Sequence, residues 1–206
     1  MSRIARRLTA GAVLALGIWC VAVSPGLSAD DEAEAKAVKE AQADLLKLKD
    51  MNGAAAKAKA KAIADASRKA ADGGDEGLKF VMRAFKPRAK GGIGVGAKGE
   101  SIELKIIGLS KRKLPAAEVG KQAKDLEMIA GVSKAISEVT HHYTPKAKKP
   151  GKDPKDWTKY TDEMTKGADE LAKAAKGGNA QEIKTAATNL NASCTNCHGT
   201  FRDSND

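Results

Sequence analysis

Near its end the chain reads Cys194-Thr195-Asn196-Cys197-His198. On a helix, positions i, i+3 and i+4 share one face about one turn apart, so both thiols and the imidazole can reach one flat cofactor. This is the attachment pattern of c-type haem, in which two thiols bind the haem vinyl groups and the histidine binds iron. The motif predicts one covalent haem c, with its iron, held by Cys194, Cys197 and His198.

Three other uses of these cysteines stay open at this stage. A redox Cys-x-x-Cys motif is expected near a strand-helix-strand unit, whereas this one closes a long helical segment. A zinc site could be completed by His141 and His142, although adjacent histidines lack the usual spacing of three to five residues. A structural disulfide between Cys194 and Cys197 would leave His198 without a role.

The first 29 residues have the composition of a secretory signal. Three arginines lie before residue 8, an apolar run covers residues 8–23, and Ala29 offers a small residue at a cleavage point. The apolar run is shorter than the roughly 20 residues that span a bilayer. Cleavage would also remove Cys20. We therefore expect a periplasmic or otherwise exported protein that has no stable membrane anchor after cleavage.

Beyond the signal the chain is basic. It holds 33 lysines and arginines, which is 36 minus the 3 of the signal, against 26 acidic residues, so the formal charge is about +7. A high isoelectric point is one cue for nucleic-acid binding. The lysines, however, alternate with acids along helical segments and lack interleaved aromatic residues, which is typical of a solvated surface. We expect no nucleic-acid partner and, from charge steering, an acidic redox partner protein.

Residues 30–74 are predicted as a helical N-terminal extension, because they are rich in Ala, Lys and Glu. The first part ends near Asn52, a helix stop signal, and residues 54–71 contain Ile63 as their one large apolar residue. We expect that second helix to bury little surface and to be weakly held. The stripe that predicts the first helix is Val38, Ala41, Leu45 and Leu48.

Four further segments carry helical start and stop signals or apolar stripes at spacings of three and four. Asp153 precedes Pro154 at one helix start, and Asn179 with Glu182 resembles a capping box at another. The predicted helices cover residues 75–86, 115–143, 153–176 and 179–202.

The connection over residues 87–114 is long and glycine-rich. Residues 94–99 match the spacing of a dinucleotide-binding fingerprint, but that fingerprint needs a strand before it and a helix after it. Residues 102–106 alternate apolar and charged side chains as a strand does. We therefore expect a flexible or hairpin-forming connection and no nucleotide site.

With its haem motif on the last of several amphipathic helices, the chain resembles the class II c-type cytochromes, the cytochrome c′ family with its methionine-ligated members. The resemblance runs from about Pro115 to Arg202. It implies an all-α fold, an antiparallel up-down four-helix bundle over residues 75–206, as a monomer or homodimer. The residues that carry it are Trp157, Asn179, residues 171–175, residues 194–198, Phe201 and Arg202. Of these, it places Trp157, Phe201 and Arg202 near the haem with the motif.

Antiparallel topology offers a check that does not depend on the family. The bundle end that holds His198 also holds the start of the first helix, the end of the second and the start of the third. Concentrated aromatic side chains would suit burial of a flat macrocycle there. Five aromatic residues fall at that end: Phe80, Tyr143, Trp157, Tyr160 and Phe201.

We expect an electron carrier and not an enzyme, because six-coordinate iron leaves no position for a substrate. Met82 is the predicted sixth ligand, since it lies about two turns into the first bundle helix, where methionine-ligated family members place theirs. His142, His141 and an open site remain the alternatives. An open, five-coordinate iron would instead bind a small diatomic gas such as NO or CO.

Overall fold

A computed structural model of the chain describes residues 29–73 and 76–202. The predicted secretory signal, residues 1–29, lies outside these residues except for Ala29. Secondary structure in the described residues is helical, with two isolated β-bridges and no strand, so the all-α prediction is confirmed. None of the described helices has the length and apolar character needed to cross a bilayer. The α-helices are α1 (Ala29–Leu48), α2 (Gly53–Ala70), α3 (Glu76–Met82), α4 (Ile102–Lys111), α5 (Ala116–His141), α6 (Pro154–Gly177) and α7 (Ala180–Phe201), with 3-10 helices η1 (Arg83–Phe85) and η2 (Arg88–Lys90).

The bounds of α6 and α7 follow from local chemistry that the sequence displays. The Asp153 carboxylate accepts a hydrogen bond from the Lys155 backbone N–H at 2.9 Å, which satisfies a donor of the first turn of α6. Gly178 ends α6 in the left-handed conformation, at φ +66°. The Asn179 side-chain oxygen then accepts from the backbone N–H groups of Gln181 and Glu182 at 2.9 and 3.2 Å. Both predicted helix starts are confirmed.

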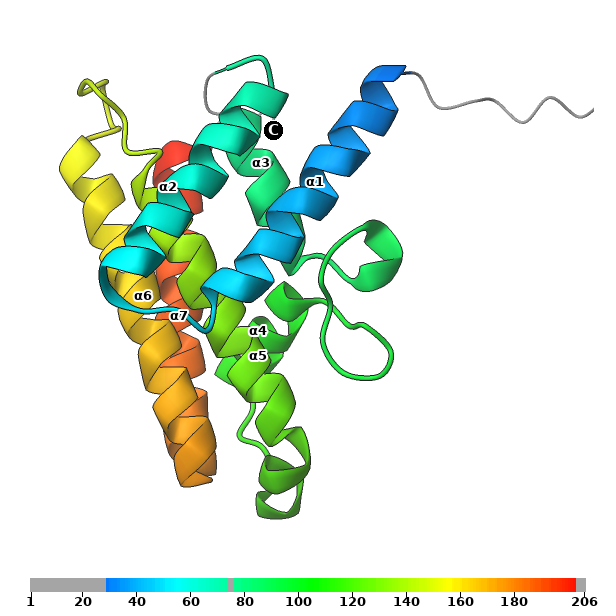
Figure 1. Cartoon of the computed structure of the whole chain (residues 1–206). Helices are drawn as coiled ribbons and strands as arrows, with labels where there is room; N and C mark the ends of the chain where they lie inside the picture. The colour runs from blue at the N-terminus through cyan, green and yellow to red at the C-terminus, as the bar shows by residue number, and fades with distance from the viewer. Residues whose placement is uncertain (1–28, 74–75, 203–206) are drawn as a thin grey trace, which may run out of the picture.

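Helices α5, α6 and α7 run antiparallel and form the body of the bundle (Figure 1). Gly167 on α6 lets two backbones approach closely, because a Cβ atom there would lie 2.9 Å from the Leu190 Cα of α7. Large apolar side chains from all three helices fill the interior. Among those that are fully buried are Leu126, Ile136, Leu171, Ile183 and Leu190.

The fourth position of the bundle is shared by two short helices, which corrects the predicted single helix over residues 75–86. The Ser101 hydroxyl at the start of α4 donates to the Phe85 carbonyl at the end of η1, at 3.0 Å. This contact joins the end of the α3 and η1 segment to the start of α4, which lies below α3 in Figure 1. Helix α4 then packs along α7, where the Thr188 hydroxyl donates to the Ser110 carbonyl at 3.3 Å. Residues 86–101 loop out between the two short helices.

The expectation of a strand over residues 102–106 was wrong, because this segment begins α4. Ser101 caps the helix by accepting from the Leu104 backbone N–H at 3.2 Å. Ile102, Ile106 and Leu109 are buried at helical spacings of four and three, while Leu104 stays 67% exposed. The apolar alternation was misleading because it counted Leu104 as a core residue. The predicted hairpin reduces to one bridge, in which Val95 and Glu100 exchange two hydrogen bonds of 2.8 Å.

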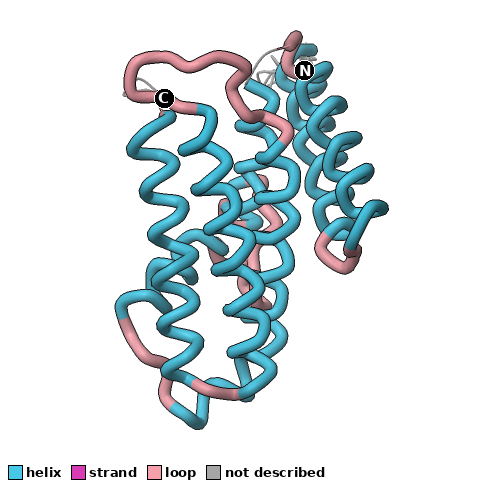
Figure 2. The backbone as a smooth tube through the Cα atoms, turned by 90° about the vertical axis from the view of Figure 1, so that its left-hand side faces the viewer, coloured by secondary structure: helices cyan, strands magenta, loops and turns pink. Residues whose placement is uncertain are grey.

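The N-terminal helices α1 and α2 pack beside each other and against α3 and α5 (Figure 2). The prediction that α2 buries little surface was wrong. Its small side chains are buried together with Ile63, and Gly77 of α3 comes so close that a Cβ there would lie 2.6 Å from the Ser67 carbonyl carbon. The Tyr143 hydroxyl after α5 also donates to the Ala64 carbonyl at 3.2 Å. Small side chains thus let α2 pack closely against its neighbours, and this close packing takes the place of large apolar side chains.

Candidate functional site

Cys194, Cys197 and His198 lie in the last turns of α7, as the motif predicted. Both thiols are half-buried and free, and His198 is exposed. Since the three residues occupy positions i, i+3 and i+4 of one continuous helix, their side chains lie on one face. The helix therefore presents two thiols and an imidazole together.

The thiols do not have the electrostatics of a redox pair. Burial raises the pKa of Cys194 to about 11, and the nearby Glu103 carboxylate acts in the same direction. Burial likewise raises the pKa of Cys197 to about 11. A reactive Cys-x-x-Cys motif depends on a cysteine whose pKa is lowered, so that a thiolate is present near pH 7. These two cysteines are protonated thiols, which argues against a disulfide oxidoreductase.

His198 carries a neutral imidazole at pH 7. Partial burial lowers its pKa below the usual value of 6.5, and the Arg202 guanidinium nearby lowers it further, while Glu103 opposes the shift. No hydrogen bond or ion pair within the described ranges engages the imidazole. Neutral imidazole is the form that binds a metal. The donor set on α7 therefore fits a group that takes two thiols and one neutral imidazole, as haem c does.

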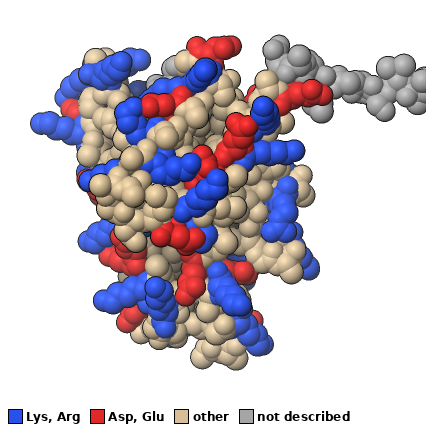
Figure 3. Space-filling model, viewed as in Figure 1, with Lys and Arg blue, Asp and Glu red and all other residues tan. Residues whose placement is uncertain are grey.

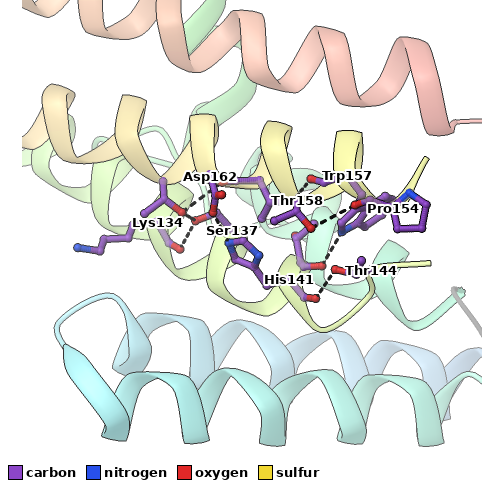
Figure 4. Close-up of polar contacts among 11 residues, drawn as sticks. Lys134, Ser137, His141, Thr144, Pro154, Trp157, Thr158 and Asp162 are labelled. Atoms are coloured by element: carbon purple, nitrogen blue, oxygen red, sulfur yellow. Dashed lines mark hydrogen bonds and ion pairs between the residues drawn. The ribbon is translucent and has the colours of Figure 1, made fainter. Parts of the chain in front are cut away.

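The four residues of the alternative zinc site do not lie together. The His141 Nε2 lies 3.2 Å from the Asp162 Oδ1 of α6, in the row of polar contacts between α5 and α6 (Figure 4). His142 lies beside α2: burial lowers its pKa first, followed by the Lys61 ammonium. Across residues 29–73 and 76–202, no three His, Cys, Asp or Glu side chains are grouped to hold a metal ion.

An uncovered apolar side chain lies at the level of the motif. Helix α4 runs antiparallel to α7, and the contact between Ser110 and Thr188 sets their register. Counting back six residues from Ser110 and forward six from Thr188 brings Leu104 level with Cys194, and Glu103 acts on the pKa of both Cys194 and His198. Leu104 is the exposed large apolar residue of the described chain. A flat apolar macrocycle bound to the cysteines would have apolar surface to cover here.

Trp157 and Phe201 close this end of the bundle. Their rings meet edge to face, with centroids 5.0 Å apart and an angle of 82° between the planes. The Trp157 indole N–H also donates to the Thr140 carbonyl at 3.0 Å, so the ring links α6 to α5 as well as to α7. Arg202 follows directly, and its backbone N–H donates to the His198 carbonyl at 3.1 Å. The structure thus brings Trp157, Phe201 and Arg202 within reach of the haem motif.

The other predicted aromatics serve different contacts. Tyr143 is buried under α2, and the Arg68 side chain lies over its ring, 4.1 Å from the centroid. Tyr160 is half-buried, with the Lys159 ammonium 5.5 Å from its ring centroid. Phe80 is buried in α3. Of the five aromatics expected at this end of the bundle, Trp157 and Phe201 therefore contact each other, whereas Tyr143 packs against the N-terminal extension.

Met82 is the last residue of α3 and is half-buried against the core. It precedes η1, whose final residue Phe85 is bound to Ser101 at the start of α4. Sequence reasoning did not identify Glu103 or Leu104 as neighbours of the motif, because residues 102–106 were expected to form a strand. The signals that could have shown α4 were Ser101 as an N-cap and the spacing of its buried apolar residues.

Comparison with known proteins gives one family. Residues 108–202, from within α4 to the end of α7, match the family described as cytochrome C′. No curated protein and no solved structure matches the chain. The matched range contains the cysteine and histidine motif, both capped helix starts and the Trp157 contact, and it begins after α1, α2 and α3.

Proposed function

We propose, from the match of residues 108–202 to the cytochrome c′ family of class II c-type cytochromes, that the chain is an exported monohaem electron carrier. This family binds covalent haem c with iron, and its members are haem proteins that typically carry electrons or bind gas. Haem iron supplies a one-electron couple whose potential depends on its axial ligands and on burial. Export is supported by the signal-like residues 1–29 and by the typically periplasmic location of the family.

Each residue of the site has a distinct part in this proposal. Cys194 and Cys197 would hold the haem covalently, and His198 would bind its iron. Trp157 and Phe201 form an apolar wall that excludes water from one edge of the haem. The observation that carries the proposal is the placement on one face of α7 of two protonated thiols and one neutral imidazole, which has no hydrogen-bond or ion-pair partner among the described residues, at the level of the exposed Leu104.

Haem staining of the denatured protein tests the cofactor. The chain, expressed with a cytochrome maturation system, should retain haem after denaturation, and the double variant Cys194→Ala, Cys197→Ala should lose it. Thr195→Ala is the matched control, because it changes an exposed residue between the two cysteines and keeps their spacing. Haem retained by the double variant, or absent from the unaltered chain, would overturn the proposal.

The proposed sixth ligand is Met82. Its position supports this proposal. Met82 ends α3 and lies three residues before Phe85, which is hydrogen-bonded to Ser101 at the start of α4. Met82→Ala should remove the long-wavelength sulfur-to-iron band of the ferric protein. Met128→Ala is the control, since Met128 is also a half-buried methionine packed against the core. An unchanged low-spin spectrum in Met82→Ala would shift the proposal to His142.

Gas binding at a five-coordinate iron is the second candidate. The observation that favours it is Leu104, an apolar residue with no ligand atom, at the level of the motif. Carbon monoxide added to the ferrous protein discriminates the two. A rapid change of the Soret band favours gas binding, whereas an unchanged spectrum with a reversible voltammetric wave favours electron transfer.

A further inference from the structure

The loop between α5 and α6 is the most basic surface segment at the end of the bundle that carries the haem motif. Residues 146–155 contain five lysines and one aspartate, so the segment has a formal charge of +4. Residues 146–151 and Lys155 are exposed. Figure 3 shows Lys and Arg side chains gathered at the upper left, where Figure 1 places this loop. We call residues 146–155 the basic loop.

The shape of the basic loop is defined by a tight turn. Lys149 and Lys152 exchange backbone hydrogen bonds of 3.2 and 2.9 Å across Pro150 and Gly151. Gly151 has φ +71°, and proline followed by such a glycine is the signature of a type II turn. Two lysines are therefore held side by side. Pre-organised charges lose less conformational entropy when a partner binds.

A direct contact attaches this turn to the haem-bearing helix. The Lys152 ammonium donates to the Phe201 carbonyl at 3.1 Å, at the last residue of α7. Phe201 is three residues after His198, which is about 4.5 Å along the helix at 1.5 Å per residue. A molecule that rests on the basic loop therefore lies beside the edge of the proposed haem.

The basic loop differs from the helix that follows it in net charge, because α6 contains five lysines and five acidic residues. Several lysines along α5 and α6 also pair with acids, as Lys134 does with Asp169 at 2.8 Å. In the basic loop Lys148 pairs with Asp153 at 2.8 Å. For Lys146 and Lys149, the described part of the chain provides no carboxylate partner. Positive charge without intramolecular compensation remains available to an anionic partner.

We propose that the basic loop is the docking surface for an acidic redox partner protein, which it brings to the haem edge beside Phe201. This inference rests on the proposed electron-carrier function. A protein partner is favoured over nucleic acid or membrane because the loop has no aromatic residue for stacking on bases and no apolar residue larger than Ala147 and Pro150 for insertion into lipid.

Voltammetry of the haem-loaded protein tests the surface without a known partner. The probes are a gold electrode coated with a carboxylate-terminated monolayer and poly-L-glutamate in solution. The patch variant is Lys146→Glu, Lys149→Glu. The control is Lys111→Glu, Lys113→Glu, which reverses the same charge in a basic run at the opposite end of the bundle, again at exposed lysines.

At low salt the electron-transfer rate at the electrode should fall about tenfold in the patch variant, at the low end of electrostatic steering effects, and less than about threefold in the control. The difference should vanish near 1 M salt, where the Debye length is about 3 Å. Poly-L-glutamate should slow the unaltered protein and the control, and leave the patch variant unaffected.

Equal slowing of electron transfer in the two variants would overturn the inference. The rate would then depend on the net charge of the protein and not on where the reversed lysines lie. The inference would also be overturned if the unaltered protein bound a DNA duplex, or vesicles of phosphatidylserine and phosphatidylcholine, more tightly than poly-L-glutamate and the patch variant alone lost that binding. Absence of any voltammetric wave in the unaltered protein is a different result, since it would refute the electron-carrier function itself.

Discussion

Gly167→Ala tests the close packing of α6 on α7, on which the position of the haem motif depends. The new Cβ would lie 2.9 Å from both the Leu190 Cα and N and 3.1 Å from the Leu190 Cβ. The nearest atoms belong to the backbone of α7, so no side-chain rotation relieves the overlap. The two helices must separate by about 0.6 Å to restore ordinary van der Waals contact at about 3.5 Å.

Two opposing free-energy terms set the expected magnitude. Overpacking of a well-packed interior costs about 1–3 kcal/mol, while alanine gains up to about 1 kcal/mol over glycine inside a helix. With the full propensity gain, the net loss of unfolding free energy should be up to about 2 kcal/mol. Gly120→Ala is the matched control, because Gly120 lies inside α5 with no atom within 4 Å of the new Cβ. That variant should gain up to about 1 kcal/mol from propensity alone.

Urea unfolding followed by circular dichroism measures both variants against the unaltered protein. The two variants should differ from each other in unfolding free energy by about 1–3 kcal/mol, which is the packing cost alone, because the propensity gain is common to both and cancels. Gly167→Ala should also alter the visible spectrum, since Leu190 lies one turn before Cys194 on α7. A Gly167→Ala protein as stable as Gly120→Ala would refute the close approach of α6 and α7.

Three further changes follow from contacts elsewhere in the fold. Gly77→Ala should detach α3 from α2, because its Cβ would lie 2.6 Å from the Ser67 carbonyl carbon. Hydrogen exchange of the α2 amides should then speed up while the α6 amides stay protected, and unchanged exchange in α2 would contradict this. Ser133→Ala should raise the unfolding free energy by about 1 kcal/mol, since the buried Ser133 hydroxyl has no hydrogen-bond partner in the described part of the chain, and a thermal melt that shows a loss would refute it. The hydrogen bond from Lys148 lowers the pKa of Asp153 below 3.8, so the stabilisation by this carboxylate is present above about pH 4 and lost as the pH falls through the folded-state pKa. Asp153→Asn should therefore be less stable than the unaltered protein at pH 7 and equal to it at pH 2, and a gap that persists in acid would contradict the assignment.

The cofactor chemistry and the long helices were readable from the sequence because both depend on local order. The haem motif needs three side chains on one helical face, and five consecutive residues specify that arrangement. Asp153 and Asn179 mark the starts of α6 and α7 in the sequence, because their side chains accept hydrogen bonds from backbone N–H groups two or three residues further on. Such interactions do not depend on the rest of the fold.

The fourth side of the bundle could not be read in the same way. Residues 102–106 satisfy both a strand period and part of a helix period, and such a short apolar run does not distinguish them. Packing against α7 decided between the two, by burying Ile102 and Ile106 and leaving Leu104 exposed. Leu104 is also where the fold has apolar surface left for a cofactor, so the same ambiguity hid part of the candidate site.

By itself the sequence determined the haem-attachment motif, the helical class and the caps of α6 and α7, because each of these is encoded within a few neighbouring residues. Only the tertiary structure decided that α3 and α4 share one side of the bundle, that α2 is held by small residues such as Ala60 and Ala64, and that Lys152 reaches Phe201. The physical reason is that close approach and burial are properties of pairs of segments far apart in the chain. The type of a side chain limits which contacts it can make. Which residue it then contacts depends on the fold, because the partner lies far away in the sequence.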